Sequence, residues 1–210
     1  MRLLMKSGQP QQQTAPVGSP TAEQRARDAL AAVRGGDTEA FARIVALYQA
    51  QVMTLALALM REPGAAEELT QDAFVRAYRH LDSFDDRRPF YPWLAKITYR
   101  LAQSARQCRA REASRRAAAE SNLQPRSDDD PAVALLADEQ ARHLWCAVQS
   151  LPAGERAAVV LYYRNGLRVS EAAQVMGVSA GAVKTFLSRA RRHLAVALGP
   201  SQQTAARRSL

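Results

Sequence analysis

Apolar residues recur every three or four positions through most of the chain, which is the period of an amphipathic helix. The spacing predicts one helix from Asp37 to Met60, and its later part is apolar on nearly every side, which favours a central position in a bundle. Two more helices are expected, over residues 65–81 and around Pro92, because proline suits the first turn of a helix. No strand pattern appears in the N-terminal half, so the sequence predicts an all-α fold.

The segment from Arg168 to Arg191 predicts two short helices joined by a tight turn. Ser170 and Ser179 are each expected to cap a helix start, because a serine hydroxyl accepts hydrogen bonds from free N–H groups. Gly177 can adopt the left-handed conformation that ends a helix, and Val178 is expected to fill the corner. This pattern is typical of a helix-turn-helix, whose second helix enters the DNA major groove. The alternative is an ordinary helical hairpin with a solvated basic face.

Three stretches without helical periodicity divide the chain. The first is rich in Gly, Pro, Gln and Ser and cannot bury enough surface to offset the entropy lost on ordering. The second contains the acidic run Ser127–Pro131, and the third follows Leu198. We therefore expect two small helical domains joined by a flexible linker, with the helix-turn-helix in the second. The expected boundaries are 1–25 for a disordered arm, 26–111 for the first domain, 112–137 for the linker, 138–198 for the second domain and 199–210 for a disordered tail.

The charge balance indicates a polyanionic partner, since the net charge is +9 and the pI is about 10.2. Cys108 and Cys146 are too few and too separated for a disulfide scaffold or a metal site, and no cofactor or metal is expected. No segment approaches the ~18 apolar residues of a membrane span, and Met1–Lys6 lacks the apolar core of a signal peptide. We therefore expect a cytoplasmic protein with no membrane span.

Two expected helices carry polar faces with candidate binding residues. On the helix over 65–81, charged residues share the surface opposite the apolar stripe, and the plainest interpretation is a salt-bridged solvent face. On the helix that follows Pro92, aromatic residues alternate with cations, as single-stranded nucleic acid requires for stacking and for backbone attraction. The alternative is that these aromatic residues belong to the core and that the arginines are only solvated. The second group consists of Trp93, Lys96, Tyr99, Arg100, Gln103 and Arg106.

The second helix of the helix-turn-helix presents small polar residues first and cations afterwards. The small residues are expected near base edges and the cations near phosphates. The residues concerned are Ser179, Gly181, Lys184, Thr185, Ser188, Arg189, Arg191 and Arg192.

Three motifs together, in their order and spacing, resemble those of a bacterial RNA polymerase sigma factor of the extracytoplasmic-function (ECF) type. They are Ala65–Arg79, Trp93–Ile97, and the pattern that runs from Leu151-Pro152 through Gly166 to Arg191. The resemblance implies that the protein binds core RNA polymerase and promoter DNA, with an anti-sigma factor as a further candidate partner and no catalysis of its own. It assigns polymerase binding to the 65–81 helix, minus-ten recognition and melting to the segment 90–111, and minus-thirty-five recognition to the second domain. The polymerase-binding residues it implies are Glu68, Gln71, Asp72, Arg76 and Arg79.

The chain departs from the family pattern at three positions. Arg100 stands where the family usually has Asn, Ser104 where it has Asp, and Phe186 where it has Arg. The first two are expected to alter promoter choice, whereas Phe186 lies beside the apolar stripe and is expected to widen it.

Two other functions can be compared with the sigma-factor interpretation. A helix-turn-helix regulator that is not a polymerase subunit predicts a ligand or receiver domain in the N-terminal half, where no such α/β pattern appears. A nucleic-acid enzyme requires a cluster of nucleophiles or metal ligands, but His80, His143 and His193 lie on different expected helices.

Overall fold

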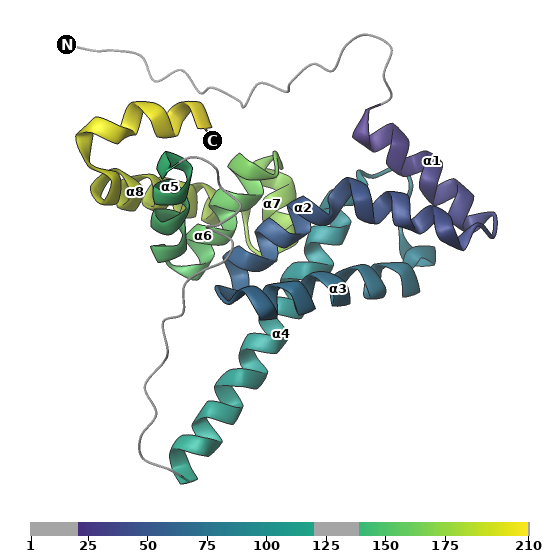
Figure 1. The fold of residues 1–210 in the computed structure, drawn as a ribbon, viewed down its shortest axis with the longest axis horizontal. Helices are drawn as coiled ribbons and strands as arrows, with labels where there is room; N and C mark the ends of the chain where they lie inside the picture. Colours follow the sequence, from purple (N-terminus) through teal and green to yellow (C-terminus); the bar gives the residue numbers. More distant parts are fainter. Residues whose placement is uncertain (1–20, 120–138, 210) are drawn as a thin grey trace.

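The structure, a computed structural model, describes residues 21–119 and 139–209. In these ranges every regular element is a helix, and the order along the chain forms an N-terminal lobe, α1 to α4, and a C-terminal lobe, α5 to α8 (Figure 1). The elements are α1 (Ala22–Arg34), η1 (Thr38–Ala40), α2 (Phe41–Met60), α3 (Pro63–Arg79), η2 (Leu81–Ser83), α4 (Phe90–Ala119), α5 (Glu139–Ser150), α6 (Ala153–Val159), the π-helical η4 (Val160–Arg164), α7 (Val169–Met176) and α8 (Ala180–Ser209). The expected all-α, two-domain fold is confirmed.

Helix α2 is the central helix of the N-terminal lobe and packs against α1, α3 and α4. Its last turns are buried on several sides, from Leu55 to Leu59, as the sequence predicts. By length and composition alone, Thr38–Met60 could cross a membrane, so the expectation that no segment approaches this limit was too strict. Its packing is that of the core helix of a helical bundle.

Local signals explain where the first helices begin and end. The Thr21 hydroxyl accepts a hydrogen bond from the backbone N–H of Gln24 (3.1 Å), and the Asp37 carboxylate accepts one from Ala40 (3.1 Å). Helix α2 ends at Arg61, which adopts a left-handed conformation with φ 66°. Pro63 then begins α3, since its missing N–H would have no helical partner there.

Helix α4 is anchored at its start and projects away from the rest of the molecule at its end (Figure 1). The rings of Phe84 and Phe90 pack edge to face, with centroids 5.1 Å apart, and fix the first turn. The buried positions of its middle part are Leu94, Ala95, Thr98 and Ala102, whereas Ile97 and Leu101 are only half-buried.

The helix-turn-helix is formed by α7 and α8. Gly177 ends α7 in the left-handed conformation (φ 68°), and the Ser179 hydroxyl accepts a hydrogen bond from Ala182 N–H (3.1 Å), both as predicted. The prediction for Ser170 was wrong, because the N-cap of α7 is Arg168, two residues earlier, and the Arg168 N–H donates to the Glu171 carboxylate (2.7 Å). Val178 does not fill the corner, since 36% of its surface remains exposed.

Two expected irregular segments are partly helical. Helix α4 continues to Ala119, past the expected start of the linker at 112, and residues 120–138 lie outside the described part. Helix α8 continues to Ser209, past the start of the tail expected over 199–210. Of the arm expected over 1–25, residues 1–20 lie outside the described residues, and α1 begins at Ala22.

The two lobes pack directly against each other, which the sequence did not predict. The side chains of Gln149 and Arg156 donate to carbonyls in the last turn of α2, to Leu57 (3.2 Å) and Ala58 respectively. The Leu57 carbonyl also accepts the backbone N–H of Arg61 (3.0 Å), and a cation near a helix C-terminus is favourable. Buried Asn165 donates to the Tyr91 hydroxyl in the N-terminal lobe, so polar contacts join the lobes at two places.

Candidate polymerase and nucleic-acid interfaces

Helix α3 exposes the five residues predicted to bind polymerase. Glu68, Gln71, Asp72, Arg76 and Arg79 all lie on the side opposite the buried positions and are exposed. None of them forms an ion pair with a described residue, so this part of the chain does not form the salt-bridged solvent face that was the alternative. Their charges are therefore available to a partner.

Two apolar residues on α3 extend this face and were missed in the sequence. Val75 is 48% exposed, and Tyr78 is 41% exposed with its ring against Phe41 (centroids 5.0 Å apart). Val75 lies four residues after Gln71 and seven after Glu68, which places it among the polar residues. That spacing was the signal for it, because an exposed apolar side chain within a polar face is typical of the centre of an interface.

Helix α4 brings the predicted minus-ten residues to one side, with different degrees of exposure. Arg100, Gln103 and Arg106 are exposed, whereas Lys96 and Tyr99 are half-buried. No acidic residue occurs between positions 90 and 111, so nothing on this stretch of helix offsets its cations. The face therefore combines cations with a partly accessible aromatic ring, as a single-strand binding surface requires.

Trp93 differs from the other predicted minus-ten residues because it is held in the aromatic cluster at the start of α4. Its ring lies 5.2 Å from that of Phe84 and 5.4 Å from that of Phe90, and it is half-buried. The alternative interpretation of the sequence, that the aromatic residues belong to the core, is therefore partly right for Trp93. This residue is better suited to hold the first turn of α4 in place than to stack on a base.

Helix α8 and the residue before it, Ser179, expose all eight predicted minus-thirty-five residues on the side away from the core. Val183 and Leu187 hold the opposite side at 0% and 5% exposure. Residues 180–198 include no acidic side chain, so the exposed side is uniformly basic. The exposed residues are Ser179, Gly181, Lys184, Thr185, Ser188, Arg189, Arg191 and Arg192.

Hydrogen bonds limit what some of these side chains can offer to DNA. The Ser179 hydroxyl accepts the capping bond and can still donate, and Thr185 donates to the Gly181 carbonyl (3.0 Å) and can still accept. Arg191 Nε donates to the Leu187 carbonyl (3.2 Å), which leaves its terminal nitrogens for a phosphate.

Helix α8 is held in place by contacts with α6. Phe186 packs so closely on Gly154 that a Cβ at that glycine would lie 3.2 Å from the Phe186 ring. The prediction that Phe186 widens the apolar stripe is therefore confirmed. The His193 ring nitrogen Nδ1 lies 2.7 Å from the buried carboxylate of Glu155 and adds a polar contact between the two helices.

The two lobes match two parts of one protein family. Residues 44–112 match Sigma-70 region 2, and residues 141–194 match Sigma-70 region 4. The match to region 2 covers most of α2, all of α3 and α4 as far as residue 112, and the match to region 4 covers the helix-turn-helix. The N-terminal lobe is therefore not the ligand or receiver domain that a helix-turn-helix regulator would require.

Three known proteins show the extent of the similarity. The chain is 34% identical over 158 residues to the probable RNA polymerase sigma factor RfaY of Xanthomonas campestris, which covers 74% of this chain and 40% of that relative's length. It is 30% identical over 166 residues to the ECF RNA polymerase sigma-E factor of Escherichia coli, covering 76% of this chain and 86% of the relative. The solved sigma factor RpoE of Bartonella quintana, in complex with the anti-sigma factor NepR, aligns with a TM-score of 0.65 at 25% identity over 75% of this chain and 96% of that one.

The all-helical lobes, the exposed α3 face, the basic faces of α4 and α8, and the two regional matches occur in the order that the sequence motifs predicted. The chain belongs to the ECF group of the sigma-70 family of RNA polymerase sigma factors.

Proposed function

We propose that this chain acts as a non-enzymatic subunit that binds core RNA polymerase through α3 and promoter DNA through α4 and α8. The observation that carries the proposal is the segregation of charge among these helices. The carboxylates of Glu68 and Asp72 are exposed without a described ion-pair partner, whereas α4 and α8 carry cations with no acidic residue over 90–111 and 180–198. One helix thus suits a basic protein surface and two suit a polyanion.

The two DNA-binding helices are assigned different promoter elements. Helix α8 places its N-terminal residues in the major groove of the minus-thirty-five element, with Lys184, Arg189, Arg191 and Arg192 near phosphates. The exposed side of α4 contacts the minus-ten element, where cations follow the single-stranded backbone and Tyr99 supplies a ring face. Binding energy then stabilises melted DNA, and the polymerase performs the chemistry.

The geometry of a promoter requires the lobes to separate. The two elements lie about 25 base pairs apart, which is about 85 Å of B-DNA at roughly 3.4 Å per base pair. Helix α4 itself has 30 residues and spans only about 45 Å at roughly 1.5 Å per residue. The faces of α4 and α8 belong to lobes that are in direct contact in Figure 1, so we infer that this arrangement precedes promoter binding.

The proposal includes a location and a further partner. We place the protein in the cytoplasm, where polymerase and chromosomal DNA are found. The solved relative RpoE is bound to an anti-sigma factor, and we propose that a partner of this class also binds this chain. An anti-sigma factor that prefers the packed lobes would oppose promoter binding, because a ligand shifts an equilibrium toward the state it binds more tightly.

Co-purification with core polymerase tests the proposal directly. The tagged full-length chain is mixed with core polymerase from the same source, and the eluted complex is examined by size-exclusion chromatography. A stoichiometric complex is expected. A chain that elutes separately from core, while still binding duplex DNA, would support a helix-turn-helix regulator in its place.

A further inference from the structure

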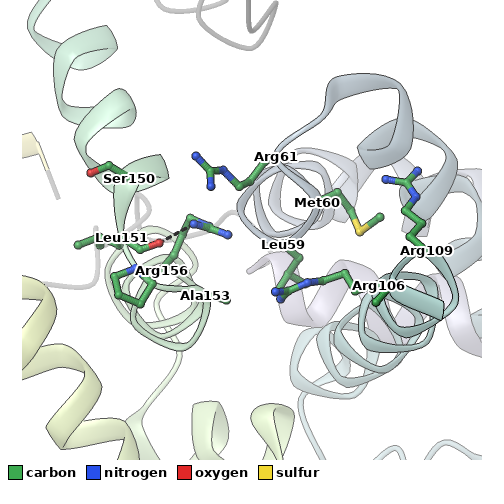
Figure 2. Close-up of a pocket in the computed structure, with 11 residues that line it drawn as sticks. Leu59, Met60, Arg61, Arg106, Arg109, Ser150, Leu151, Ala153 and Arg156 are labelled. Atoms are coloured by element: carbon green, nitrogen blue, oxygen red, sulfur yellow. Dashed lines mark hydrogen bonds between the residues drawn. The ribbon is translucent and has the colours of Figure 1, made fainter. Parts of the chain in front are cut away.

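A cavity of about 620 Å³ lies between the two lobes. It is bordered by the end of α2, the middle of α4, and the segment from Ser150 to Arg156 in the C-terminal lobe (Figure 2). Its size is within the usual range for small-molecule sites. Four guanidinium groups line it, those of Arg61, Arg106, Arg109 and Arg156.

The positive charge around this cavity is poorly balanced. Among the described residues, one carboxylate forms an ion pair with one of these four arginines. It is that of Glu62, which lies 3.5 Å from Arg109. Arg61, Arg106 and Arg156 form no ion pair with a described residue, and Figure 2 shows their guanidinium groups around the gap between the lobes. Burial of the Arg156 side chain lowers its pKa to about 10, and the charges of Arg61 and Arg106 add to the effect.

Arg156 is fixed in place and retains free donors. It is 3% exposed, and its Nε and Nη1 atoms donate to three backbone carbonyls, those of Ala58, Gln149 (3.0 Å) and Leu151 (2.6 Å). A guanidinium has five N–H donors, so the two on Nη2 have no hydrogen-bond partner among the described residues. A buried cation with unused donors beside two further cations favours an anionic ligand.

The backbone of Arg61 provides a second, independent observation. The other left-handed positions with φ near 70–100° in the described chain are occupied by Gly36, Gly166 and Gly177, which have no Cβ penalty. Arg61 adopts the same conformation (φ 66°) at a cost that a glycine would avoid. Residues held in such conformations occur preferentially at ligand clamps, and here the conformation places a long cationic side chain at the cavity.

We propose that this cavity between the lobes is a binding site for a small polyphosphate anion, held by Arg61, Arg106 and Arg156. A chain of phosphate groups carries several negative charges over a few ångströms, and the fork of each guanidinium matches phosphate oxygens in a bidentate manner. A single carboxylate would neutralise one of the three cations and leave the others unpaired. Arg61 and Arg106 belong to the N-terminal lobe and Arg156 to the C-terminal lobe, so the anion bridges the lobes and stabilises their packed arrangement.

Isothermal titration calorimetry of the full-length chain tests this site, with sodium tripolyphosphate and ATP as probes at constant ionic strength. One site per chain is expected. Arg61→Asn removes the guanidinium but keeps a residue that tolerates the left-handed conformation, and should weaken binding at least about tenfold, the loss expected for one charged hydrogen bond. Arg61→Gly should give the same result if the first variant folds poorly. Similar affinities for both probes indicate recognition of the phosphate chain itself, and tighter ATP binding indicates a nucleotide.

Two charge-matched controls separate the site from general attraction to a basic protein. Arg88→Gln removes an exposed cation in the loop before α4, and Arg25→Gln removes an exposed cation from α1, away from the cavity. Each should change the affinity less than twofold. The inference is overturned if neither probe binds saturably, if several sites titrate per chain, or if the Arg61 variants lose no more affinity than these controls. The assay contains no polymerase, so its outcome is independent of the proposed function.

Discussion

At the scale of single residues, the α3 face is notable because its charges have no described ion-pair partner in the chain. Exposed carboxylates and guanidinium groups one or two helical turns apart often pair, but Glu68, Asp72, Arg76 and Arg79 do not. An exposed pair contributes little to stability, so leaving these charges unpaired costs the fold little. The unpaired charges instead favour the formation of a complex, in which complementary charges determine the partner and its orientation.

Charge reversal on this face should abolish polymerase binding without unfolding the protein. In Glu68→Lys/Asp72→Lys, both changes are at exposed positions, so the helical circular dichroism and Tm should stay near those of wild type. Affinity for core polymerase should fall by about 100-fold or more, because like charges that meet across an interface cost several kcal/mol. Fluorescence anisotropy with labelled protein measures the loss.

The matched control is Glu39→Lys/Asp82→Lys, which changes the net charge equally at exposed positions outside α3. It should bind core polymerase nearly as wild type does. Equal losses in the two double variants would show that overall charge, rather than the α3 face, governs the association.

Residue-level prediction from the sequence worked where one side chain acts on its own helix. Asp37, Gly177 and Ser179 have the capping roles that their chemistry suggested. Ser170 failed because a second signal competed with it: Glu171 reaches back to the N–H of Arg168 and starts α7 earlier. Both signals were in the sequence, and only the packing of α7 selects between them.

At the scale of helices, the basic side of α8 should bind DNA with a strong dependence on salt. If Lys184, Arg189, Arg191 and Arg192 each neutralise one phosphate, they should contribute about −3.6 to the slope of log K against log salt. The assay belongs in the complex with core polymerase, where both lobes engage the promoter. Equal slopes for the wild-type complex and for a variant with all four cations changed to Gln would show that this side of α8 does not contact the DNA backbone.

Thr185 on the same helix should contribute to sequence choice, since its hydroxyl can accept a hydrogen bond beyond the one it donates to Gly181. Thr185→Ala should weaken binding to cognate promoters by about tenfold and change binding to scrambled ones much less. A loss of equal size on every promoter would argue against a base-reading role.

Helix α4 differs from the family pattern at two exposed positions that should alter promoter choice. Arg100 and Ser104 replace an amide and a carboxylate, and a guanidinium only donates hydrogen bonds whereas an amide also accepts them. Arg100→Asn/Ser104→Asp should change the bases selected from a library randomised across the melted region. It should also make the salt dependence shallower, because a less cationic face displaces fewer counterions.

The single variants Arg100→Asn and Ser104→Asp should show intermediate behaviour. Identical selected sequences and identical salt slopes in all four proteins would show that Arg100 turns away from the DNA. Helical periodicity was sufficient to place both residues on the exposed side of α4. It did not reveal that Trp93 is held by Phe84, because that contact joins α4 to the loop before it.

At the scale of the whole molecule, the contact between the lobes is the feature that sequence reasoning could not provide. Each lobe can be predicted from its own motifs, but the sequence predicted that a flexible linker would be the only connection between them. The contact depends on Arg156 and Asn165, which read in the sequence as ordinary polar residues near helix ends. Contacts between residues so far apart in the chain produce no periodic pattern in the sequence.

Separation of the lobes on promoter binding can be followed with the two native cysteines. Cys108 on α4 and Cys146 on α5 are both free and exposed, and the chain has no others. With a donor and an acceptor dye on this pair, energy transfer should be high in the free protein and should fall when core polymerase and promoter DNA are added. The reason is that the proposed separation of the lobes moves α5 away from α4.

A control pair within the N-terminal lobe, Cys108 with Asp82→Cys in a Cys146→Ser background, should show no change in transfer. Unchanged transfer between Cys108 and Cys146 in an active promoter complex would show that the packed arrangement persists on DNA.

The most direct test of the sigma-factor assignment is run-off transcription from genomic fragments by core polymerase, with and without this protein. Core polymerase with the wild-type chain should produce discrete transcripts from a limited set of fragments, whereas core polymerase alone, or with Glu68→Lys/Asp72→Lys, should not. The same transcripts with and without the protein would contradict the assignment, and so would specific transcripts of wild-type intensity from the double variant.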